Sequence, residues 1–461
     1  MTQWSHVEKI AAIAVELAAL GYPITFIVGR TFQNHIVNLH PNIKFLPLQG
    51  LDDKMSDEDT ATFLQLSSGV EQEIFIMKKV LADGIKDGHD TLQSFFKEFR
   101  DKYGNKKPLI SLYDQTVPGH HPILMGGPGL RPDTSIGISL APLTLDSNDT
   151  YPFRTGKAPH TGPESKELHR KAYEKIFDDR LEREFNQYWW EKLEEAGVKL
   201  ETYPRILHAM GSLPDYLMTL GVPEFQFPRS DLRPNVRYFG AFKKVGKQGD
   251  DTVSQLPSWW EDVVKAKAEG LKIVAVSQGT VEVRPEDLVL PALEALKDRK
   301  DILVIATFVV SEPEDVPGLV VPSNARVAKF VPYDLLLPLV DVLVTNGGYG
   351  AVQHCLRLGV PMVVSGEGQD KTETNAIIEY TGVGINLKGR YPGVDSIRDA
   401  VARILEDETF KTNVKSLSTK YEKYDIAREF DRVISDAVRD WQIIRRWRQD
   451  GSVSGSYRYE Q

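Results

Sequence analysis

The segment Arg326–Leu387 reads RVAKFVPYDLLLPLVDVLVTNGGYGAVQHCLRLGVPMVVSGEGQDKTETNAIIEYTGVGINL and has the clearest structural pattern in the chain. Short apolar runs of strand length alternate in it with longer segments in which apolar residues recur at helical spacing. The predicted strands are Arg326–Phe330, Val342–Thr345, Pro361–Val364 and Gly384–Leu387. Strands that alternate with helices are typical of a parallel sheet covered by helices, so the segment predicts an α/β fold.

The same alternation continues on the N-terminal side of this segment. A helix that carries Val7, Ile13 and Leu17 on one face is predicted to end at Gly21. Further strands are predicted at Ile24–Val28, Ile43–Leu48, Leu109–Tyr113, Ile136–Leu140, Leu271–Val276 and Ile302–Thr307, and one long charged helix at Glu167–Leu193.

The stretch Lys243–Gln255 contains hardly an apolar residue, which is typical of a linker between domains. We therefore expect two tandem doubly wound domains with parallel sheets, followed by a helix. The predicted limits are 1–242 for the N-terminal domain, 243–255 for the linker, 256–423 for the C-terminal domain, 424–450 for a helix that packs back on the N-terminal domain, and 451–461 for a disordered tail.

Composition narrows the class of protein. The 461 residues include 56 Lys and Arg against 65 Asp and Glu, a net charge of −9, so nucleic acid and anionic membrane surfaces are poor partners. The single cysteine, Cys355, excludes an intrachain disulfide. No apolar run is long enough for a membrane span, and no secretion signal is recognisable. We expect a soluble cytoplasmic enzyme without integral membrane association.

Two strand-to-helix junctions have the composition of phosphate-binding turns. Val276 is followed by Ser277-Gln278-Gly279-Thr280, and Thr345 by Asn346-Gly347-Gly348-Tyr349-Gly350. Glycines let backbone N–H groups approach an anion at a helix N-terminus, although tight α/β turns need glycine as well. Gly348-x-Gly350-x-x-Gln353 imitates a dinucleotide fingerprint, but its third position is not glycine and its strand is not the first of its domain.

With these motifs, the segment 326–387 resembles the donor-binding signature of the family 1, nucleotide-sugar-dependent glycosyltransferases, especially the bacterial and fungal macrolide and sterol glucosyltransferase branch. The resemblance extends to VAVSQGT at 274–280 and to SHVEKIAAIAVELAALGYPITFIVG at 5–29. It implies a GT-B fold, two facing Rossmann-like domains, and inverting transfer of a hexose from a nucleotide sugar, with UDP-glucose as co-substrate. It also implies no metal or other cofactor, and a lipophilic small-molecule acceptor such as a sterol, polyketide or phenol.

The resemblance also implies roles for individual residues. Phe330 would stack on the base, the Val331 backbone would bind its edge, and His354 stands where many members bind the ribose. The diphosphate would lie on Asn346, Gly347 and Gly348, helped by Ser277, Gly279 and Thr280, with Gly350 and Ala351 in the following turn. Asp370 and Lys371 match the pair that touches the sugar hydroxyls.

His6 matches the catalytic base of the family, and Asp114 matches the carboxylate that orients it. An imidazole suits proton removal from an acceptor hydroxyl near neutral pH. The alternatives are that His6 is a polar residue at a helix N-terminus and that Asp114 is a turn residue at a strand end. His120 and His121 are interpreted as pocket lining or solvated loop, and as base candidates only if His6 fails.

The chain departs from the family at two places. Asn346 stands where members usually have a histidine, so this position cannot carry positive charge. The chain begins five residues before His6, where members have an inner strand of the N-terminal sheet. Either the start was assigned downstream of the true one, which we favour, or the domain is rearranged. Rival hypotheses are a catalytically silent nucleotide-sugar-binding protein and a GT-B nucleotide-sugar epimerase.

Two weaker patterns have ordinary explanations. Asp57-Glu58-Asp59 has the form of a manganese-binding motif but lies in an acidic run that predicts a solvated, loop-like surface. Trp189 and Trp190 would either wall an acceptor cleft or pack in the core or a domain interface.

Overall fold

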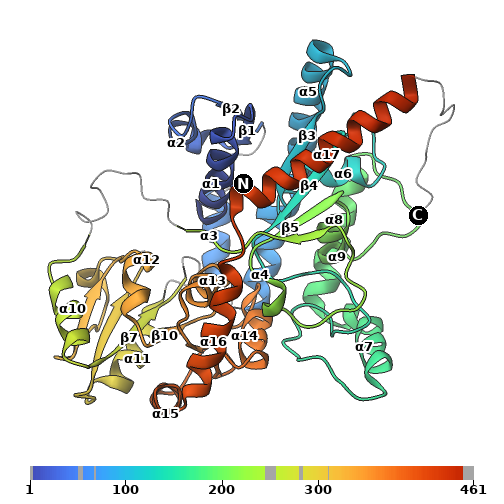
Figure 1. The fold of residues 1–461 in the computed structure, drawn as a ribbon. Helices are drawn as coiled ribbons and strands as arrows, with labels where there is room; N and C mark the ends of the chain where they lie inside the picture. The colour runs from blue at the N-terminus through green and yellow to red at the C-terminus, as the bar shows by residue number, and fades with distance from the viewer. Residues whose placement is uncertain are drawn as a thin grey trace.

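The computed structural model describes residues 4–49, 56–66, 69–243, 256–279, 284–309 and 311–449 (Figure 1). In this part of the chain the strands form three sheets, and neighbouring strands are parallel throughout. Two sheets lie in the N-terminal half and one in the C-terminal half, with helices packed around them (Figure 1). The predicted linker after residue 243 and the predicted tail lie outside the described residues.

The C-terminal sheet has six strands in the order β12-β11-β10-β7-β8-β9. They are β7 (Lys272–Ser277), β8 (Ile302–Thr307), β9 (Ala325–Ala328), β10 (Val342–Thr345), β11 (Met362–Val364) and β12 (Gly384–Asn386). Both faces of this sheet are covered, because Ile273 and Ala275 of β7 belong to one buried cluster and Val274 and Val276 to another. Burial on both faces explains why the inner strands are mostly apolar, whereas the edge strands β9 and β12 contain Arg326 and Asn386.

The N-terminal half contains a two-stranded sheet and a four-stranded sheet. The first pairs β1 (Ile24–Val28) with β2 (Ile43–Pro47), and the second has the order β3 (Ile110–Asp114), β4 (Thr134–Ser139), β5 (Tyr216–Thr219) and β6 (Val236–Tyr238). No strand of the described residues lies between β1 and β3 and pairs with both. The N-terminal strands therefore form two separate sheets, and the division falls where the sequence led us to expect that an inner strand is missing.

Helix α1 (Trp4–Ala19) packs against both parts of this divided sheet. Its Val7 and Ala14 are buried with β1, whereas Ile13 and Leu17 belong to the cluster that contains Ile136 of β4. The other helices of this half are α2 (Gln33–Val37), α3 (Asp57–Gln65), α4 (Val70–Ile76), α5 (Ile85–Tyr103), α6 (His121–Leu124), α7 (Ser165–Glu174), α8 (Arg180–Glu195) and α9 (Ile206–Ser212).

The long helix predicted at Glu167–Leu193 is wrong, since this stretch forms α7 and α8 with a short 3₁₀ turn between them. Asp179 has extended backbone angles, and its carboxylate accepts a hydrogen bond from the backbone N–H of Glu182 at 3.0 Å. This side chain caps a new helix N-terminus, which the apolar periodicity alone does not indicate.

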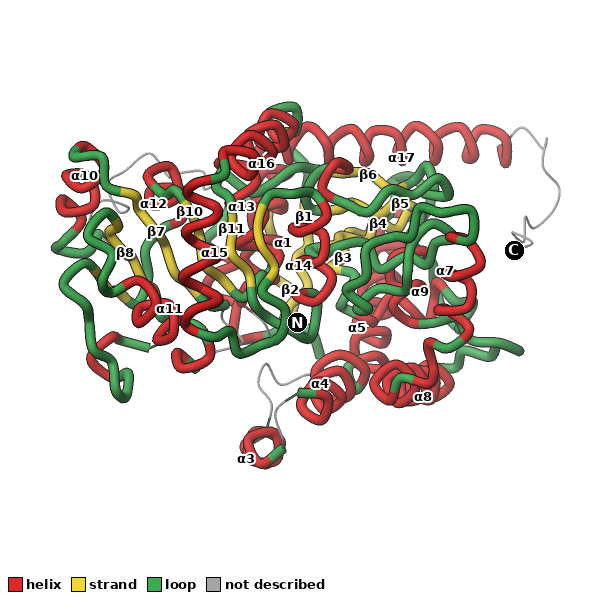
Figure 2. The backbone as a smooth tube through the Cα atoms, turned by 90° about the horizontal axis from the view of Figure 1, so that it is seen from below, coloured by secondary structure: helices red, strands yellow, loops and turns green. Residues whose placement is uncertain are grey.

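Helices of the C-terminal half cover its sheet and then return to the N-terminal half. They are α10 (Trp260–Ala268), α11 (Val289–Leu296), α12 (Tyr333–Leu336), α13 (Tyr349–Leu358), α14 (Lys371–Tyr380), α15 (Val394–Glu406), α16 (Glu408–Tyr421) and α17 (Ile426–Gln449). Figure 2 shows α17 running from α16 across to the N-terminal half. There the hydroxyl of Tyr22 donates to Asp431 at 2.6 Å, and the rings of Phe239 and Phe430 lie 5.3 Å apart.

The two halves also share a buried core. One cluster of buried residues includes Ile136 and Met218 of the N-terminal half together with Leu343 and Tyr349 of the C-terminal half. The Tyr349 hydroxyl donates to the carbonyl of Leu220 at 3.0 Å. No helix of the described residues combines the length and apolar character needed to cross a membrane.

Candidate active site

The strand order of the C-terminal sheet reverses between β7 and β10. From β7 the chain proceeds to β8 and β9 on one side, and then returns to β10 on the other side. Ligands of open α/β sheets bind at such a reversal, outside the carboxyl ends of the strands. Because Ser277 pairs in register with Thr345, the two predicted phosphate turns begin side by side.

The turn after β10 is shaped by close backbone packing. Gly347 has a φ of 86°, and a Cβ there would lie 1.7 Å from Oδ1 of Asn375. Gly348 precedes the first residue of α13, and its N–H donates weakly to Oδ1 of the buried Asn346 at 3.4 Å. The first N–H groups of a helix have no partner within the helix, so this turn presents donors and a partial positive charge to an anion.

The turn after β7 lies against the first one. A Cβ on Gly279 would lie 3.6 Å from Nδ2 of Asn346. Ser277 is buried, and its hydroxyl accepts a hydrogen bond from Thr307 at 2.7 Å. Thr280 lies outside the described residues.

The residues predicted to hold the nucleoside differ in exposure. The Phe330 ring is 53% exposed beyond the end of β9, whereas Val331 is buried in the core. His354 lies on α13, in the helical turn after Gly350 and Ala351. Burial lowers the pKa of His354 to about 4, although Asp334 raises it, so this imidazole is neutral near pH 7 and offers hydrogen bonds without charge.

Asp370 and Lys371 lie at the start of α14. Asp370 is the residue before the helix, and Lys371 is its first residue. Lys371 is buried, and its ammonium donates to Oε1 of Gln369 at 2.9 Å. Gln369 itself has a φ of 48°, a left-handed conformation that costs energy for a residue with a side chain and indicates a tightly held loop.

His6 and Asp114 form a hydrogen-bonded pair. Nδ1 of His6, in the first turn of α1, lies 2.7 Å from Oδ2 of Asp114 at the end of β3. The other oxygen of Asp114 accepts from the backbone N–H and the hydroxyl of Thr116, at 2.9 Å and 2.6 Å. A carboxylate only accepts, so Nδ1 carries the proton and Nε2 is left as an acceptor.

The electrostatics of this pair suit a base. Burial lowers the pKa of His6, but the charge and hydrogen bond of Asp114 outweigh burial, so the pKa is raised above 6.5. Burial would raise the pKa of Asp114, yet His6 and Thr116 hold it below its usual value. Asp114 therefore remains the acceptor of this pair, and its charge makes His6 a stronger base than burial alone would allow.

The turns after β7 and β10 are called the donor turns here, after their predicted role in binding the sugar donor. They and the His6–Asp114 pair lie near each other at the junction of the two halves. The charge of Asp370 raises the pKa of both His6 and Lys9. Lys9 lies one helical turn after His6, and its Nζ is 3.4 Å from where a Cβ would stand on Gly350. Sequence reasoning missed Lys9, although its spacing of three residues from His6 on a helix could have placed it on the same face.

A loop of the N-terminal half reaches the start of α14. The N–H of Arg154 donates to Glu373 at 3.2 Å, and its guanidinium donates to Glu73 at 2.6 Å. Glu73, on α4, also accepts from the backbone N–H of Gln369 at 3.1 Å. These contacts tie the loop that precedes Asp370 to two elements of the other half, and no short motif in the sequence indicates them.

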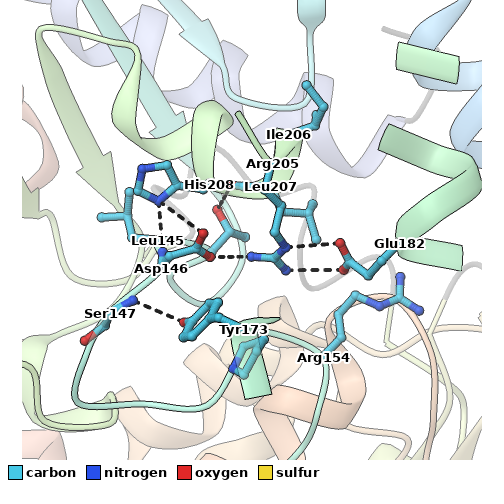
Figure 3. A network of polar contacts seen from close by, with 12 residues as sticks. Leu145, Asp146, Ser147, Arg154, Tyr173, Glu182, Arg205, Ile206, Leu207 and His208 are labelled. Atoms are coloured by element: carbon cyan, nitrogen blue, oxygen red, sulfur yellow. Dashed lines mark hydrogen bonds and ion pairs between the residues drawn. The ribbon is translucent and has the colours of Figure 1, made fainter. Parts of the chain in front are cut away.

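A buried polar network anchors the loop that carries Arg154 (Figure 3). The guanidinium of Arg205 binds both carboxylate oxygens of Glu182, at 3.1 and 3.2 Å, and also the carboxylate of Asp146. The N–H of Asp146 donates to Nδ1 of His208 at 3.0 Å. Since each charge has an opposite charge and hydrogen bonds, the network can be buried and still hold the loop in place.

Other candidates from the sequence differ from His6 in their surroundings. His120 and His121 are buried, not solvated, and burial lowers their pKa values to about 3 and about 4. Trp189 is fully buried in a core cluster, and Trp190 is partly buried and donates to the carbonyl of Pro204 at 3.0 Å.

The acidic run at Asp57–Asp59 was expected to be loop-like, and this expectation is wrong. It forms the first turn of α3, where the Ser56 hydroxyl accepts from the N–H of Asp59 at 3.0 Å. Acidic residues stabilise a helix N-terminus, which accounts for their position.

Comparison with known proteins places this geometry in a family. The model of the erythromycin biosynthesis protein CIII-like C-terminal domain matches residues 293–423. The structure of the glycosyltransferase of kitacinnamycin has a TM-score of 0.60 at 18% identity, covering 93% of this chain and 94% of that one, which shows the GT-B fold.

Two fungal relatives cover nearly the whole chain. UDP-glycosyltransferase 2 of Phaeomoniella chlamydospora is 34% identical, over 92% of this chain and 91% of that protein. UDP-glucosyltransferase avaP of Aspergillus versicolor is 33% identical, over 92% of both chains. With this identity over both halves, the protein described here belongs to the UDP-glycosyltransferase family.

Proposed function

We propose that this enzyme transfers glucose from UDP-glucose to a hydroxyl of a lipophilic small molecule, with inversion at the anomeric carbon and without a metal. The observation that carries the proposal is the 2.7 Å contact of His6 with Asp114 beside the donor turns. The names of relatives such as UDP-glucosyltransferase avaP support UDP-glucose as the donor. The resemblance to macrolide and sterol glucosyltransferases supports a lipophilic acceptor.

In the proposed reaction, Nε2 of His6 removes the proton of the acceptor hydroxyl as its oxygen attacks the anomeric carbon. The new carbon–oxygen bond forms while the bond to the diphosphate breaks, and its electron pair leaves with UDP. Asp114 keeps the imidazole in the required tautomer and stabilises the imidazolium that forms, in the manner of a triad acid. Nucleophile and leaving group lie on opposite sides of the carbon, which is why the configuration inverts.

The donor would lie along the C-terminal half. Phe330 and Val331 would hold the base and His354 the ribose. The diphosphate would bind the turn Asn346-Gly347-Gly348 together with the first turn of α13, and Asp370 and Lys371 would bind the sugar. Preorganised N–H donors at a helix N-terminus stabilise charge that develops on a leaving group, which is the task that a metal ion performs in other transferases.

The test is turnover that depends on an acceptor. Purified enzyme is mixed with UDP-glucose and 4-methylumbelliferone or cholesterol, and release of UDP and formation of the glucoside are measured. UDP release that requires the acceptor supports transfer. Conversion of UDP-glucose without an acceptor would favour an epimerase, and binding of UDP-glucose without any turnover across a wider set of hydroxylated acceptors would favour a silent binding protein.

A further inference from the structure

Lys9 places a positive charge from the N-terminal half over a helix of the C-terminal half. Its Nζ lies 3.4 Å, and its Cε 3.6 Å, from the position of a Cβ on Gly350, the second residue of α13. The side chain thus crosses from α1 to the helix N-terminus that follows the donor turn. These are ordinary contact distances, so the end of the Lys9 side chain lies directly against this turn of the helix.

The ammonium of Lys9 has few protein partners. It donates to the carbonyl of Ser5 at 3.1 Å, and no carboxylate of the described residues forms an ion pair with it. An ammonium has three N–H donors, so hydrogen-bonding capacity remains for another acceptor.

The surroundings of Lys9 favour an anion. Burial lowers the pKa of Lys9, whereas the charges of Glu8, Asp114 and Asp370 raise it, and the net shift is downward. A partly buried cation that also faces the positive end of a helix is unfavourable by itself. An anion between the ammonium and the first N–H groups of α13 would remove both costs.

The donor turn has no formal charge of its own. Asn346 is neutral, and the glycines after it offer only backbone N–H groups. His354, further along α13, has a pKa lowered to about 4 by burial and is neutral near pH 7. A diphosphate at this turn would therefore depend on side chains of other elements for positive charge, and Lys9 approaches the turn from the other half of the molecule.

We propose that Lys9 is a catalytic residue whose ammonium binds the diphosphate of the nucleotide sugar and stabilises the charge that it gains on departure. The inference rests on the proposed function and adds a residue to it. When the carbon–oxygen bond breaks, its electron pair moves onto the diphosphate, the acceptor proton goes to His6, and Lys9 stays protonated and forms no covalent bond. Because Lys9 and α13 belong to different halves, the diphosphate would also hold the two halves together.

The test compares Lys9→Met and Lys9→Gln, which remove the charge, with Lys9→Arg, which keeps it. Lys44→Met is the matched control, since it makes the same change at an exposed lysine of the same half. Dissociation constants of UDP and of uridine are measured by calorimetry, and the initial rate of acceptor-dependent UDP release at saturating UDP-glucose is measured with 4-methylumbelliferone. Unfolding midpoints establish which variants are folded.

We expect Lys9→Met and Lys9→Gln to raise the dissociation constant of UDP by at least roughly 10-fold. The dissociation constant of uridine should not change. We also expect the turnover rate to fall roughly 100-fold, the scale of losing one donor to developing charge. Lys9→Arg should recover part of both losses, and Lys44→Met should change neither. Wild-type affinity for UDP and a wild-type rate in a folded Lys9→Met or Lys9→Gln variant would overturn the role of Lys9 alone. Failure of the wild-type enzyme to bind UDP would overturn the proposed function and this inference together.

Discussion

Two histidine sites adjoin the same strand, β3, and differ in what holds the imidazole. At the end of the strand, Asp114 binds His6 at 2.7 Å, and the pKa of His6 is raised despite burial. Three residues earlier, the Ser111 hydroxyl binds His120 at 2.7 Å, and burial lowers the pKa of His120 to about 3. His121, next in the chain, has no hydrogen-bond partner in the described residues on either ring nitrogen.

The difference shows that a carboxylate partner, and not burial, makes a histidine useful as a base near pH 7. Burial disfavours the imidazolium, and only a nearby negative charge reverses this effect. His120 and His121 are neutral near pH 7. They can fill space and accept or donate hydrogen bonds, but they hold a proton too weakly to remove one from an acceptor.

The largest effect is expected from His6→Ala. Loss of the general base should lower the rate of glucosyl transfer by roughly 10³-fold, within the range of measured general-base contributions. Binding of UDP, measured by calorimetry, should not change, because the proposed partner of His6 is the acceptor hydroxyl and not the diphosphate. Loss of UDP binding together with turnover would instead assign His6 to the donor site.

Asp114→Asn should come next, with a rate roughly 100-fold lower, since the amide cannot stabilise the imidazolium. The charge of Asp114 is what raises the pKa of His6, so its removal lets burial dominate. The acid limb of the pH profile of kcat/KM, which we expect above pH 6.5 in the wild type, should therefore move to lower pH. An acid limb that stays in place would mean that another group limits the rate.

His121→Leu should change how the free energy of unfolding depends on pH, but it should leave the pH profile of the rate unaltered. The native pKa of about 4 lies below the unfolded value of 6.5, so the unfolded chain binds more protons as the pH falls. The stability that neutral His121 contributes is present above pH 6.5 and is lost toward pH 4. Between pH 7 and pH 5 the free energy of unfolding of the wild type should fall by about 2 kcal/mol relative to the variant.

Urea unfolding at the two pH values measures this difference. His6 should show the opposite pH dependence and serves as a control. Its raised pKa contributes stability to the native state that is present below pH 6.5 and is lost as the pH rises. An equal slope for His121→Leu and the wild type would show that the pKa of His121 is the same in the native and the unfolded state.

Ser111→Ala should give the smallest effect. It removes one hydrogen bond to His120 and should cost about 1 kcal/mol of unfolding free energy, with an unchanged acid limb. Chemical denaturation and the pH profile are measured on the same preparation. A shift of the acid limb would connect His120 to the chemistry and remove the contrast between the two sites.

The C-terminal half was predicted well because its information is local. The inner strands of its sheet are short, mostly apolar runs buried on both faces, and Gly347 occupies a turn that only glycine fits. The N-terminal half was predicted less well. Strands β5 and β6 went unpredicted, and the break between α7 and α8 depends on one capping side chain, Asp179.

The candidate site divides in the same way. His6 and Asp114 were expected together from a family resemblance, since 108 residues separate them and no spacing connects them. The contacts of Lys9 with Gly350, of Arg154 with Glu373 and of Glu73 with Gln369 have no sequence signature at all. They depend on how the two halves meet.

The sequence by itself determined that this protein has an α/β fold and a glycine-rich donor turn, because apolar periodicity and backbone conformation act over a few neighbouring residues. Only the tertiary structure decided which histidine has a carboxylate partner and which cation lies beside the turn. Those properties arise from charges that approach through space, and in a buried site the effect of a charge depends on distance and desolvation, not on separation along the chain.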